Sequence, residues 1–206
     1  MELNIKEVDG IAYKVFSPVY PVIAEQIKDK TGINKGLCLD IGAVGGYLGM
    51  ELSKITDLSV CLSDKMLKNT YENIRSNGLG HKVKTLLGNV NEIPIKDESI
   101  NLVISRALES FWADIEKIFK EIYRVLTPGG TAYIGGRLGI SELKDQVPSK
   151  MKKRNKEGKG GIIKKLNDNP IAIIEKALYQ AEIKSFAINM DESGVWVTIR
   201  RLNTKH

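Results

Sequence analysis

The sequence has little cysteine and little histidine, which limits the metal and disulfide chemistry it can support. Its 206 residues include two cysteines, Cys38 and Cys61, and two histidines, His81 and His206. This set is too small for a disulfide framework and does not supply a four-ligand zinc site. We therefore expect no metal centre, and a cytoplasmic protein whose thiols stay reduced and pack as small buried hydrophobes.

Long apolar runs are also missing, which argues against a membrane protein. No run approaches the roughly 18–20 apolar residues that cross a bilayer. The first ten residues carry four charged side chains and no signal-peptide pattern. Apolar residues make up 42% and charged residues 27% of the chain, as in a globular domain with a core. With no repeat and no low-complexity linker, residues 1–206 are predicted to form a single domain.

The net charge of +6 comes from one segment and not from the whole chain. Lys150–Lys165 contains eight basic residues and a single acidic one, Glu157. Seven of the eight are lysines, which grip phosphate less specifically than arginine, and no aromatic residue is interleaved for base stacking. The segment lies within the polar stretch Arg137–Asn169, which we predict to be an insertion or lid that orders only with an acceptor or partner.

Apolar periodicity predicts alternating strands and helices along most of the chain. Strands are predicted at Leu37–Ile41, Leu58–Leu62, Val83–Leu87, Ile100–Ser105, Thr131–Ile134, Lys184–Met190 and Val195–Leu202. Helices are predicted at Val19–Lys30, Gly46–Ile55, 64–77 with Ser63 as N-cap, 115–126 with Asp114 as cap and Pro128-Gly129-Gly130 as breaker, and Pro170–Glu182. The pattern indicates a three-layer α/β fold, mostly parallel with an antiparallel C-terminal hairpin. Ligands of such sheets lie beyond the carboxyl ends of the strands.

A glycine-rich turn follows the first predicted strand, in the run Asp40-Ile41-Gly42-Ala43-Val44-Gly45-Gly46-Tyr47. Glycines let the backbone approach a ligand, and the helix that follows offers N–H groups to an anion. No Gly-Lys-Ser/Thr follows, which excludes a phosphate loop. The run also lacks two of the three glycines of a dinucleotide fingerprint.

Three segments in order resemble the class I S-adenosylmethionine-dependent methyltransferases. They are Leu39-Asp40-Ile41-Gly42 with Gly46, then Gly88-Asn89-Val90 through Ile93-Pro94 and Ile100-Asn101-Leu102-Val103, and finally Glu121-Ile122-Tyr123-Arg124-Val125-Leu126-Thr127-Pro128-Gly129-Gly130. The resemblance covers about residues 16–136 and is to the small-molecule, UbiE-like (type-11) branch. It implies a Rossmann-like seven-stranded sheet with an antiparallel last strand, and an enzyme that uses S-adenosylmethionine.

The resemblance also implies cofactor-binding roles for individual residues. Around the methionine part it implies Gly42, Ala43 and Gly46 as lining, Asp40 as the residue that orders the turn, and Tyr20 as a cap. Around the ribose and adenine it implies Cys61, Leu62, Met66, Gly88, Asn89 and Val90, with Ser105 and Arg106 as the floor.

Three positions in the matching segments depart from the family pattern. Val44 stands where a glycine is expected, Cys61 where an acid normally binds the ribose hydroxyls, and Asn89 where an aspartate is usual. The Asn89 side-chain oxygen still accepts a hydrogen bond from an amino group. Asp64, three residues after Cys61, is a candidate substitute for the acid. These departures leave open a partner subunit that binds the cofactor weakly and is not catalytic.

The residues that follow the fourth predicted strand bear on the acceptor. Ser105-Arg106-Ala107-Leu108 does not match the Asn-Pro-Pro-Tyr-like motif of base- and glutamine-modifying relatives, which favours a small-molecule acceptor over nucleic acid. Glu109 and Arg106 are candidates for positioning the acceptor or moving a proton, and Phe111-Trp112 for the pocket wall or the core. Arg106 and Arg137 would favour an acidic acceptor. His81 precedes a strand and is placed away from the site. An RNA methyltransferase guided by Lys150–Lys165 remains the alternative.

Overall fold

The computed structural model describes residues 17–63, 67–106, 108, 113–136, 170–191 and 194–203, without the side chains of Val44 and Leu67. The helices are α2 (Val19–Thr31), the short 3-10 turn η1 (Val44–Gly46), α3 (Tyr47–Ile55), α4 (Leu67–Ser76), α5 (Ile115–Val125) and α8 (Pro170–Gln180). The strands are β1 (Lys35–Ile41), β2 (Asp57–Ser63), β3 (Val83–Leu86), β4 (Ile100–Ser105), β5 (Leu126–Gly136), β6 (Phe186–Asp191) and β7 (Gly194–Arg200).

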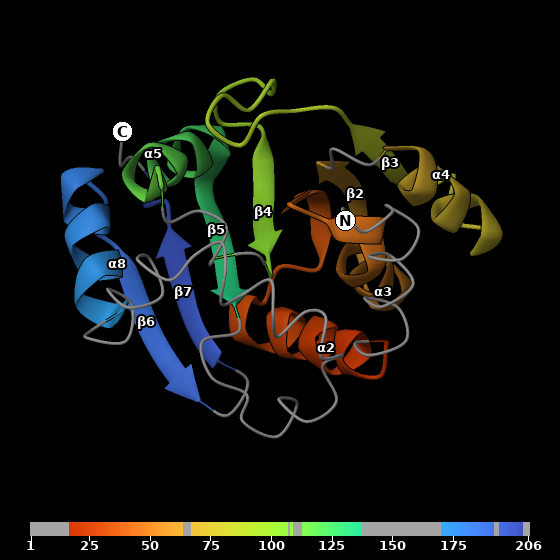
Figure 1. The fold of residues 1–206 in the computed structure, drawn as a ribbon, viewed down its shortest axis with the longest axis horizontal. Coiled ribbons are helices and arrows are strands. Elements are labelled where there is room, and N and C mark those ends of the chain that lie inside the picture. The colour runs from red at the N-terminus through yellow and green to blue at the C-terminus, as the bar shows by residue number, and fades with distance from the viewer. Residues whose placement is uncertain are drawn as a thin grey trace, which may run out of the picture.

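The seven strands form one sheet in the order β3-β2-β1-β4-β5-β7-β6 (Figure 1). Strands β1 to β5 run parallel to one another, and β7 runs antiparallel to both β5 and β6. The strand order reverses between β1 and β4, so ligands are expected where these two strands end. We refer to the carboxyl ends of β1 to β4, with the loops that follow them, as the carboxyl edge. The predicted mostly parallel α/β sheet with an antiparallel last strand is confirmed.

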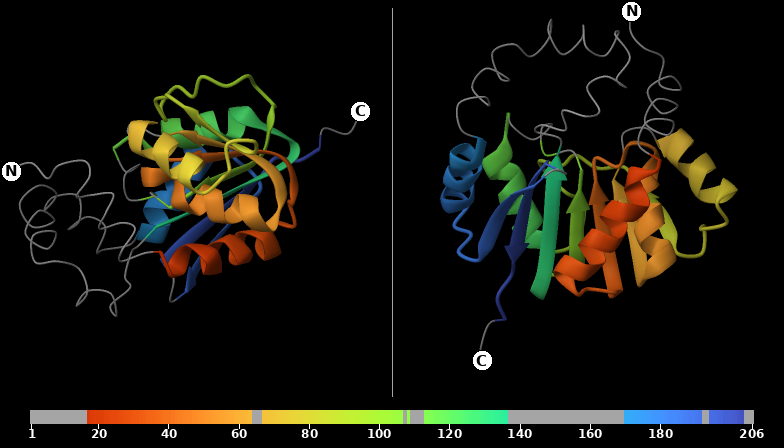
Figure 2. Two further views of the ribbon diagram at one scale, coloured as in Figure 1. Left: turned by 90° about the vertical axis from the view of Figure 1, so that its right-hand side faces the viewer. Right: turned by 90° about the horizontal axis from the view of Figure 1, so that it is seen from below.

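Helices cover both faces of the sheet and give three layers. Figure 2 shows α5 on one side of the strands and α2 on the other. The core beneath α5 and α8 includes Phe119, Ile122 and Leu178, all fully buried. The opposite core packs α2 and α3 on the sheet through residues such as Ile27 and Leu52. Among the residues the structure describes, no helix has both the length and the apolar character of a membrane span.

The prediction that Pro128-Gly129-Gly130 ends the preceding helix and lies before the fifth strand is wrong. Helix α5 ends at Val125, and the following residue, Leu126, is extended (φ −66°, ψ 134°) and begins β5. The Pro-Gly-Gly stretch lies inside the strand, where Gly129 N–H donates to the Arg201 carbonyl and Arg201 N–H to the Gly130 carbonyl. The register of β4 against β5 shifts beside it. Proline and two glycines are thus accommodated as an irregular strand, because β7 and its extension supply backbone partners.

The predicted cap of α5 is corrected in part. Asp114 does precede α5, but its side chain makes no capping hydrogen bond. Its Oδ2 accepts instead from the Asn91 side-chain amide at 3.2 Å. Ser63 is the last described residue of β2, and its role as N-cap of the next helix stays a prediction, because residues 64–66 lie outside the described residues.

The end of β5 is packed by Trp196 of β7. The Tyr133 and Trp196 rings stack with centroids 4.9 Å apart, and the Tyr133 hydroxyl accepts from Gln26 of α2 at 2.8 Å. Burial raises the pKa of Tyr133. A Cβ at Gly135 would lie 2.0 Å from the Trp196 ring. Because Gly135 has no side chain, the Trp196 indole can lie against the sheet. The contacts of Trp196 with Tyr133, and of Tyr133 with Gln26, then connect β7 to α2.

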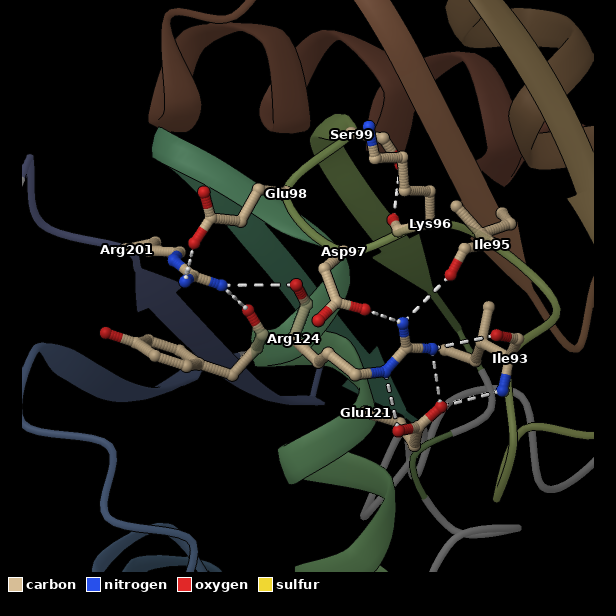
Figure 3. A network of polar contacts seen from close by, with 10 residues as sticks. Ile93, Ile95, Lys96, Asp97, Glu98, Ser99, Glu121, Arg124 and Arg201 are labelled. Atoms are coloured by element: carbon tan, nitrogen blue, oxygen red, sulfur yellow. Dashed lines mark hydrogen bonds and ion pairs between the residues drawn. The ribbon is translucent and has the colours of Figure 1, made fainter.

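Arg124 of α5 holds the loop between β3 and β4 (Figure 3). Its guanidinium donates to the carbonyls of Ile93 and Ile95 at 2.8 and 2.9 Å, and pairs with Asp97 at 2.5 Å. Glu121, one turn earlier, accepts two bonds from the same guanidinium and a third from Ile93 N–H. One arginine–glutamate pair thereby fixes the backbone on either side of Pro94. This explains why Glu121 and Arg124 occur together in the helix.

We predict that Gly135→Ala destabilises the protein by about 1–3 kcal/mol, the usual cost of overpacking a core. The added methyl group would overlap the Trp196 ring, which is buried and cannot move aside freely. Urea unfolding followed by circular dichroism measures the change. Gly80→Ala is the control, because a Cβ there meets no atom within 4 Å. Equal unfolding free energies for Gly135→Ala and the wild type would contradict this packing.

We also predict that Glu121 contributes stability that is lost in acid. The hydrogen bonds from Arg124 lower the pKa of Glu121 below its ordinary value of 4.5. A carboxyl whose pKa is lowered on folding stabilises the protein above its unfolded pKa, and this stabilisation disappears as the pH falls through the folded pKa. The unfolding free energy of the wild type should therefore fall more steeply below pH 4.5 than that of Glu121→Gln.

Unfolding in urea at a series of pH values between about 6 and 3 tests this difference. Glu116→Gln on the same helix is the matched control. Its ion pair with Lys120 is exposed, and such pairs contribute little to stability. Parallel pH profiles for Glu121→Gln and the wild type would show that the contact between Glu121 and Arg124 does not stabilise the folded state through the Glu121 charge.

Candidate functional site

The glycine turn between β1 and α3 adopts a backbone that requires glycine. Gly42, Gly45 and Gly46 have φ of 71°, 71° and 76°, in the left-handed region that other residues rarely enter. A Cβ at Gly46 would also lie 2.4 Å from a methyl carbon of Leu62. The turn therefore lies directly on β2, which brings its backbone to the carboxyl edge.

Backbone hydrogen bonds from the neighbouring strand hold the start of this turn. The Ser63 carbonyl at the end of β2 accepts from Gly42 N–H at 3.1 Å and from Ala43 N–H at 3.3 Å. Gly46 N–H then donates back to the Ala43 carbonyl at 3.0 Å. Ala43 is buried, whereas Gly42 is exposed at the carboxyl edge. A ligand at this edge would meet Gly42 first.

Asp40 connects the end of β1 to the first turn of α3. Its carboxylate is 2% exposed, and its Oδ2 accepts from Gly49 N–H at 3.0 Å. The early N–H groups of a helix have no partner within the helix, and a negative charge there interacts favourably with the helix dipole. A Cβ at Gly49 would lie 2.5 Å from Leu62. Asp40 thus orders the turn from within the protein, with its carboxylate turned away from solvent.

The end of β2 presents a thiol where an acid was expected. Cys61 is half-buried, and burial raises the pKa of its thiol above the ordinary 9.0, so the group is neutral near pH 7. The Leu62 side chain is fully buried beneath Gly46 and Gly49. Asp64 and Met66 lie outside the described residues. Cys61 therefore brings no negative charge to the ribose position predicted from the sequence.

The loop after β3 carries the residues predicted to lie along the adenine. A Cβ at Gly88 would be 3.0 Å from Pro94, the residue between the two carbonyls that Arg124 holds. Asn89 is exposed, and its Oδ1 accepts from Asn91 N–H at 3.0 Å. Val90 is half-buried. The hydrogen bonds of Arg124 on either side of Pro94 thus support this part of the carboxyl edge.

The end of β4 completes the carboxyl edge. Ser105 is buried, and its hydroxyl donates to the Ile41 carbonyl at 2.7 Å, joining β4 to β1 where the strand order reverses. The next residue, Arg106, places its guanidinium 5.4 Å from the centre of the Tyr20 ring. Tyr20 stacks in turn on Tyr47 at 5.6 Å. The aromatic pair and the arginine therefore lie beside the glycine turn.

The structure brings the described candidates together at one edge of the sheet. Those it describes are Tyr20, Asp40, Gly42, Ala43, Gly46, Cys61, Leu62, Gly88, Asn89, Val90, Ser105 and Arg106. Outside the described residues lie Met66, Asp64, Glu109, Phe111, Trp112, Arg137 and the predicted lid of residues 137–169. His81 precedes β3 at the opposite, amino edge, as predicted.

Sequence reasoning missed Asn73 of α4. Its side-chain Nδ2 donates to the Gly45 carbonyl at 3.0 Å and to the Tyr47 hydroxyl at 3.2 Å. Its distance from the glycine run in the sequence hides this contact, because only the packing of α4 on the turn brings the two together. The apolar spacing of a helix gives no signal for such a polar residue at its margin.

The carboxyl edge fits S-adenosylmethionine. Gly42 leaves exposed backbone beside the N-terminus of α3, whose dipole favours the carboxylate of an amino acid. Asn89 offers amide groups at the surface some distance along the same edge, where hydrogen bonds to an adenine can form. The site thus combines a helix N-terminus, which favours an anion, with a polar loop further along the carboxyl edge.

Comparison with known proteins agrees with this arrangement. A family profile described as a methyltransferase domain matches residues 39–134. A solved structure from Methanococcus maripaludis, assigned to the S-adenosyl-L-methionine-dependent methyltransferases, is 32% identical and superposes with a TM-score of 0.83. That alignment covers 100% of this chain and 99% of the other.

Two curated relatives match over shorter stretches. The arsenite methyltransferase of Halobacterium salinarum is 31% identical over 91 residues, which is 44% of this chain and 22% of the relative. Sterol 24-C-methyltransferase of Aspergillus fumigatus is 30% identical over 120 residues, 55% of this chain and 32% of the relative. The chain thus spans only a fifth to a third of these proteins. Its fold, its carboxyl edge and its full-length likeness to the archaeal structure establish that it belongs to the class I S-adenosylmethionine-dependent methyltransferases, in the type-11 branch.

Proposed function

We propose that this chain transfers the methyl group of S-adenosylmethionine to a small-molecule acceptor. The observation that carries the proposal is that the glycine turn, the end of β2 and the Asn89–Val90 loop lie side by side along the carboxyl edge, next to the reversal between β1 and β4. The names of the two curated relatives described above refer to arsenite and a sterol, which supports an acceptor of small size. The chain also lacks aromatic residues among the lysines of 150–165 for stacking nucleotide bases.

The residues of the carboxyl edge would bind and orient the cofactor. The backbone at Gly42 and the first turn of α3 would receive the methionine part, with Asp40 keeping that turn in place. Cys61 would face the ribose as an uncharged thiol, and Asn89 would meet the adenine. When bound, S-adenosylmethionine supplies an electrophilic methyl group on its sulfonium, which an acceptor nucleophile attacks in line. The protein would hold the cofactor and the acceptor in line with each other and exclude water.

The acceptor would enter beside Tyr20 and Arg106. These residues lie at the methionine side of the edge, where the transferable methyl group would be. The Arg106 guanidinium favours an acceptor that carries negative charge. A nucleophilic acceptor needs no protein base for attack on a sulfonium methyl group, so the proposal does not depend on Glu109.

The direct test of this proposal is cofactor binding followed by methyl transfer. Isothermal titration calorimetry should show that the purified chain binds S-adenosylmethionine and S-adenosylhomocysteine with one site per chain. Transfer of radiolabel from methyl-labelled cofactor is then measured with small acids, thiols, arsenite and quinones, and with RNA. Absence of binding at millimolar cofactor would refute the proposal. Transfer to RNA alone would replace the small-molecule acceptor, and binding without transfer to any acceptor class would favour a partner subunit.

We predict that Cys61→Asp binds S-adenosylmethionine about tenfold more tightly, because a charge-assisted hydrogen bond to a ribose hydroxyl contributes roughly 1.5–3 kcal/mol. Cys61 is half-buried, so a carboxylate there can remain solvated on one side. Cys61→Ser is the matched control and should bind like the wild type. Asp64→Ala should also leave the affinity unchanged. Unaltered affinity in Cys61→Asp together with weaker binding in Asp64→Ala would show that Asp64 already serves the ribose.

A further inference from the structure

We infer that Asn73 is a positioning residue for the methionine part of the cofactor. Its side-chain amide holds the glycine turn and links it to the aromatic pair at the acceptor side. This inference rests on the proposed function, because it concerns the same site. Asn73 lies on α4, outside the motif segments.

Helix α4 covers the buried side of the glycine turn through two residues one turn apart. Thr70 is fully buried, and its methyl group would lie 3.2 Å from a Cβ at Gly46. Asn73, three residues later and therefore on the same helix face, donates through Nδ2 to the Gly45 carbonyl at 3.0 Å. Gly45 is buried, and a buried backbone carbonyl is stabilised by each donor that reaches it. The Asn73 amide thus fixes the peptide between Gly45 and Gly46.

This peptide determines where the first turn of α3 begins. Gly46 is the N-cap of α3, and both Gly45 and Gly46 have positive φ, so small rotations are open to them that other residues would resist. A loosened Gly45 peptide would spread the N–H groups that meet a carboxylate. The Asn73 hydrogen bond restricts that freedom before a ligand arrives, which lowers the entropy cost of binding.

The same Nδ2 group also donates to the Tyr47 hydroxyl at 3.2 Å. Tyr47 is the first residue of α3 and stacks on Tyr20, over which the Arg106 guanidinium lies. A chain of direct contacts therefore runs from α4 through the glycine turn to the end of β4. Asn73 therefore bonds to both the backbone of the glycine turn and the aromatic stack.

The experiment compares two ligands that share adenosine but differ in the amino acid part. S-Adenosylhomocysteine contains the homocysteine carboxylate and amine, and 5′-methylthioadenosine lacks both. Asn73→Asp keeps the size of the side chain but removes its N–H donors, and Asn73→Leu removes all polarity. Loss of one or two neutral hydrogen bonds predicts an S-adenosylhomocysteine affinity about three- to tenfold lower in either variant. The affinity for 5′-methylthioadenosine should not change.

Asn77→Leu is the matched control. Asn77 directly follows the last residue of α4, is exposed, and its side-chain amide donates to the Asn73 backbone carbonyl at 2.9 Å. It should retain wild-type affinity for both ligands. Tyr47→Phe provides a second, independent variant. If Asn73 acts partly through Tyr47, replacing Asn73 in the Tyr47→Phe background should cost less affinity than in the wild type.

The outcomes separate the inference from the proposed function. A selective loss of S-adenosylhomocysteine affinity in variants that melt cooperatively supports the positioning role. Unchanged affinity, or equal losses for both ligands, overturns it. In that case wild-type binding of S-adenosylhomocysteine still supports the proposed function, whereas no binding by the wild type refutes the proposed function itself. Additive effects in the Tyr47→Phe background overturn the link to the aromatic pair.

Discussion

The close approach of the glycine turn to Leu62 is the constraint on which the carboxyl edge depends. A Cβ at Gly46 or Gly49 would lie within 2.5 Å of a Leu62 methyl group, so α3 can start where it does only because both positions lack a side chain. Where the turn passes over β2, the Asp40 carboxylate accepts a hydrogen bond from Gly49 N–H. The Ser63 carbonyl accepts from the N–H groups at the start of the turn. The N-terminus of α3 is thereby presented at the reversal of strand order, where an α/β sheet binds ligands.

Two sets of polar contacts extend this arrangement in opposite directions along the carboxyl edge. On the adenine side, Arg124 and Glu121 hold the backbone around Pro94, which packs on Gly88. On the methionine side, Asn73 reaches the turn and the Tyr47 hydroxyl. In both sets, a side chain from a neighbouring helix bonds to backbone atoms of the carboxyl edge. The site is consequently shaped by main-chain position more than by charged side chains, which suits an edge where a neutral thiol stands in the expected place of an acid.

Much of this could be predicted from the sequence, because the strands are apolar runs with clear boundaries and the motif segments lie at their carboxyl ends. Ile100–Ser105 has the predicted boundaries, and the order of the segments fixes the place of the glycine turn. The failures have a common cause. Pro128-Gly129-Gly130 and Asp114 have strong local preferences, but residues distant in sequence determine their structure, namely the Arg201 backbone and the Asn91 side chain. Asn73 could not be found because no local pattern marks a side chain that bonds 28 residues away.

The central claim is that the cofactor lies along the carboxyl edge, from the glycine turn after β1 past the end of β2 to the loop after β3, with its amino acid part at the glycine turn. A crystal structure of the chain with S-adenosylhomocysteine tests this claim most directly. The account predicts the homocysteine carboxylate beside Gly42 and the start of α3, the ribose beside Cys61 and the adenine against the Asn89–Val90 loop. Ligand density in the groove between α5 and α8, which Ile115, Lys120 and Ile173 line, with none at the glycine turn, would contradict it.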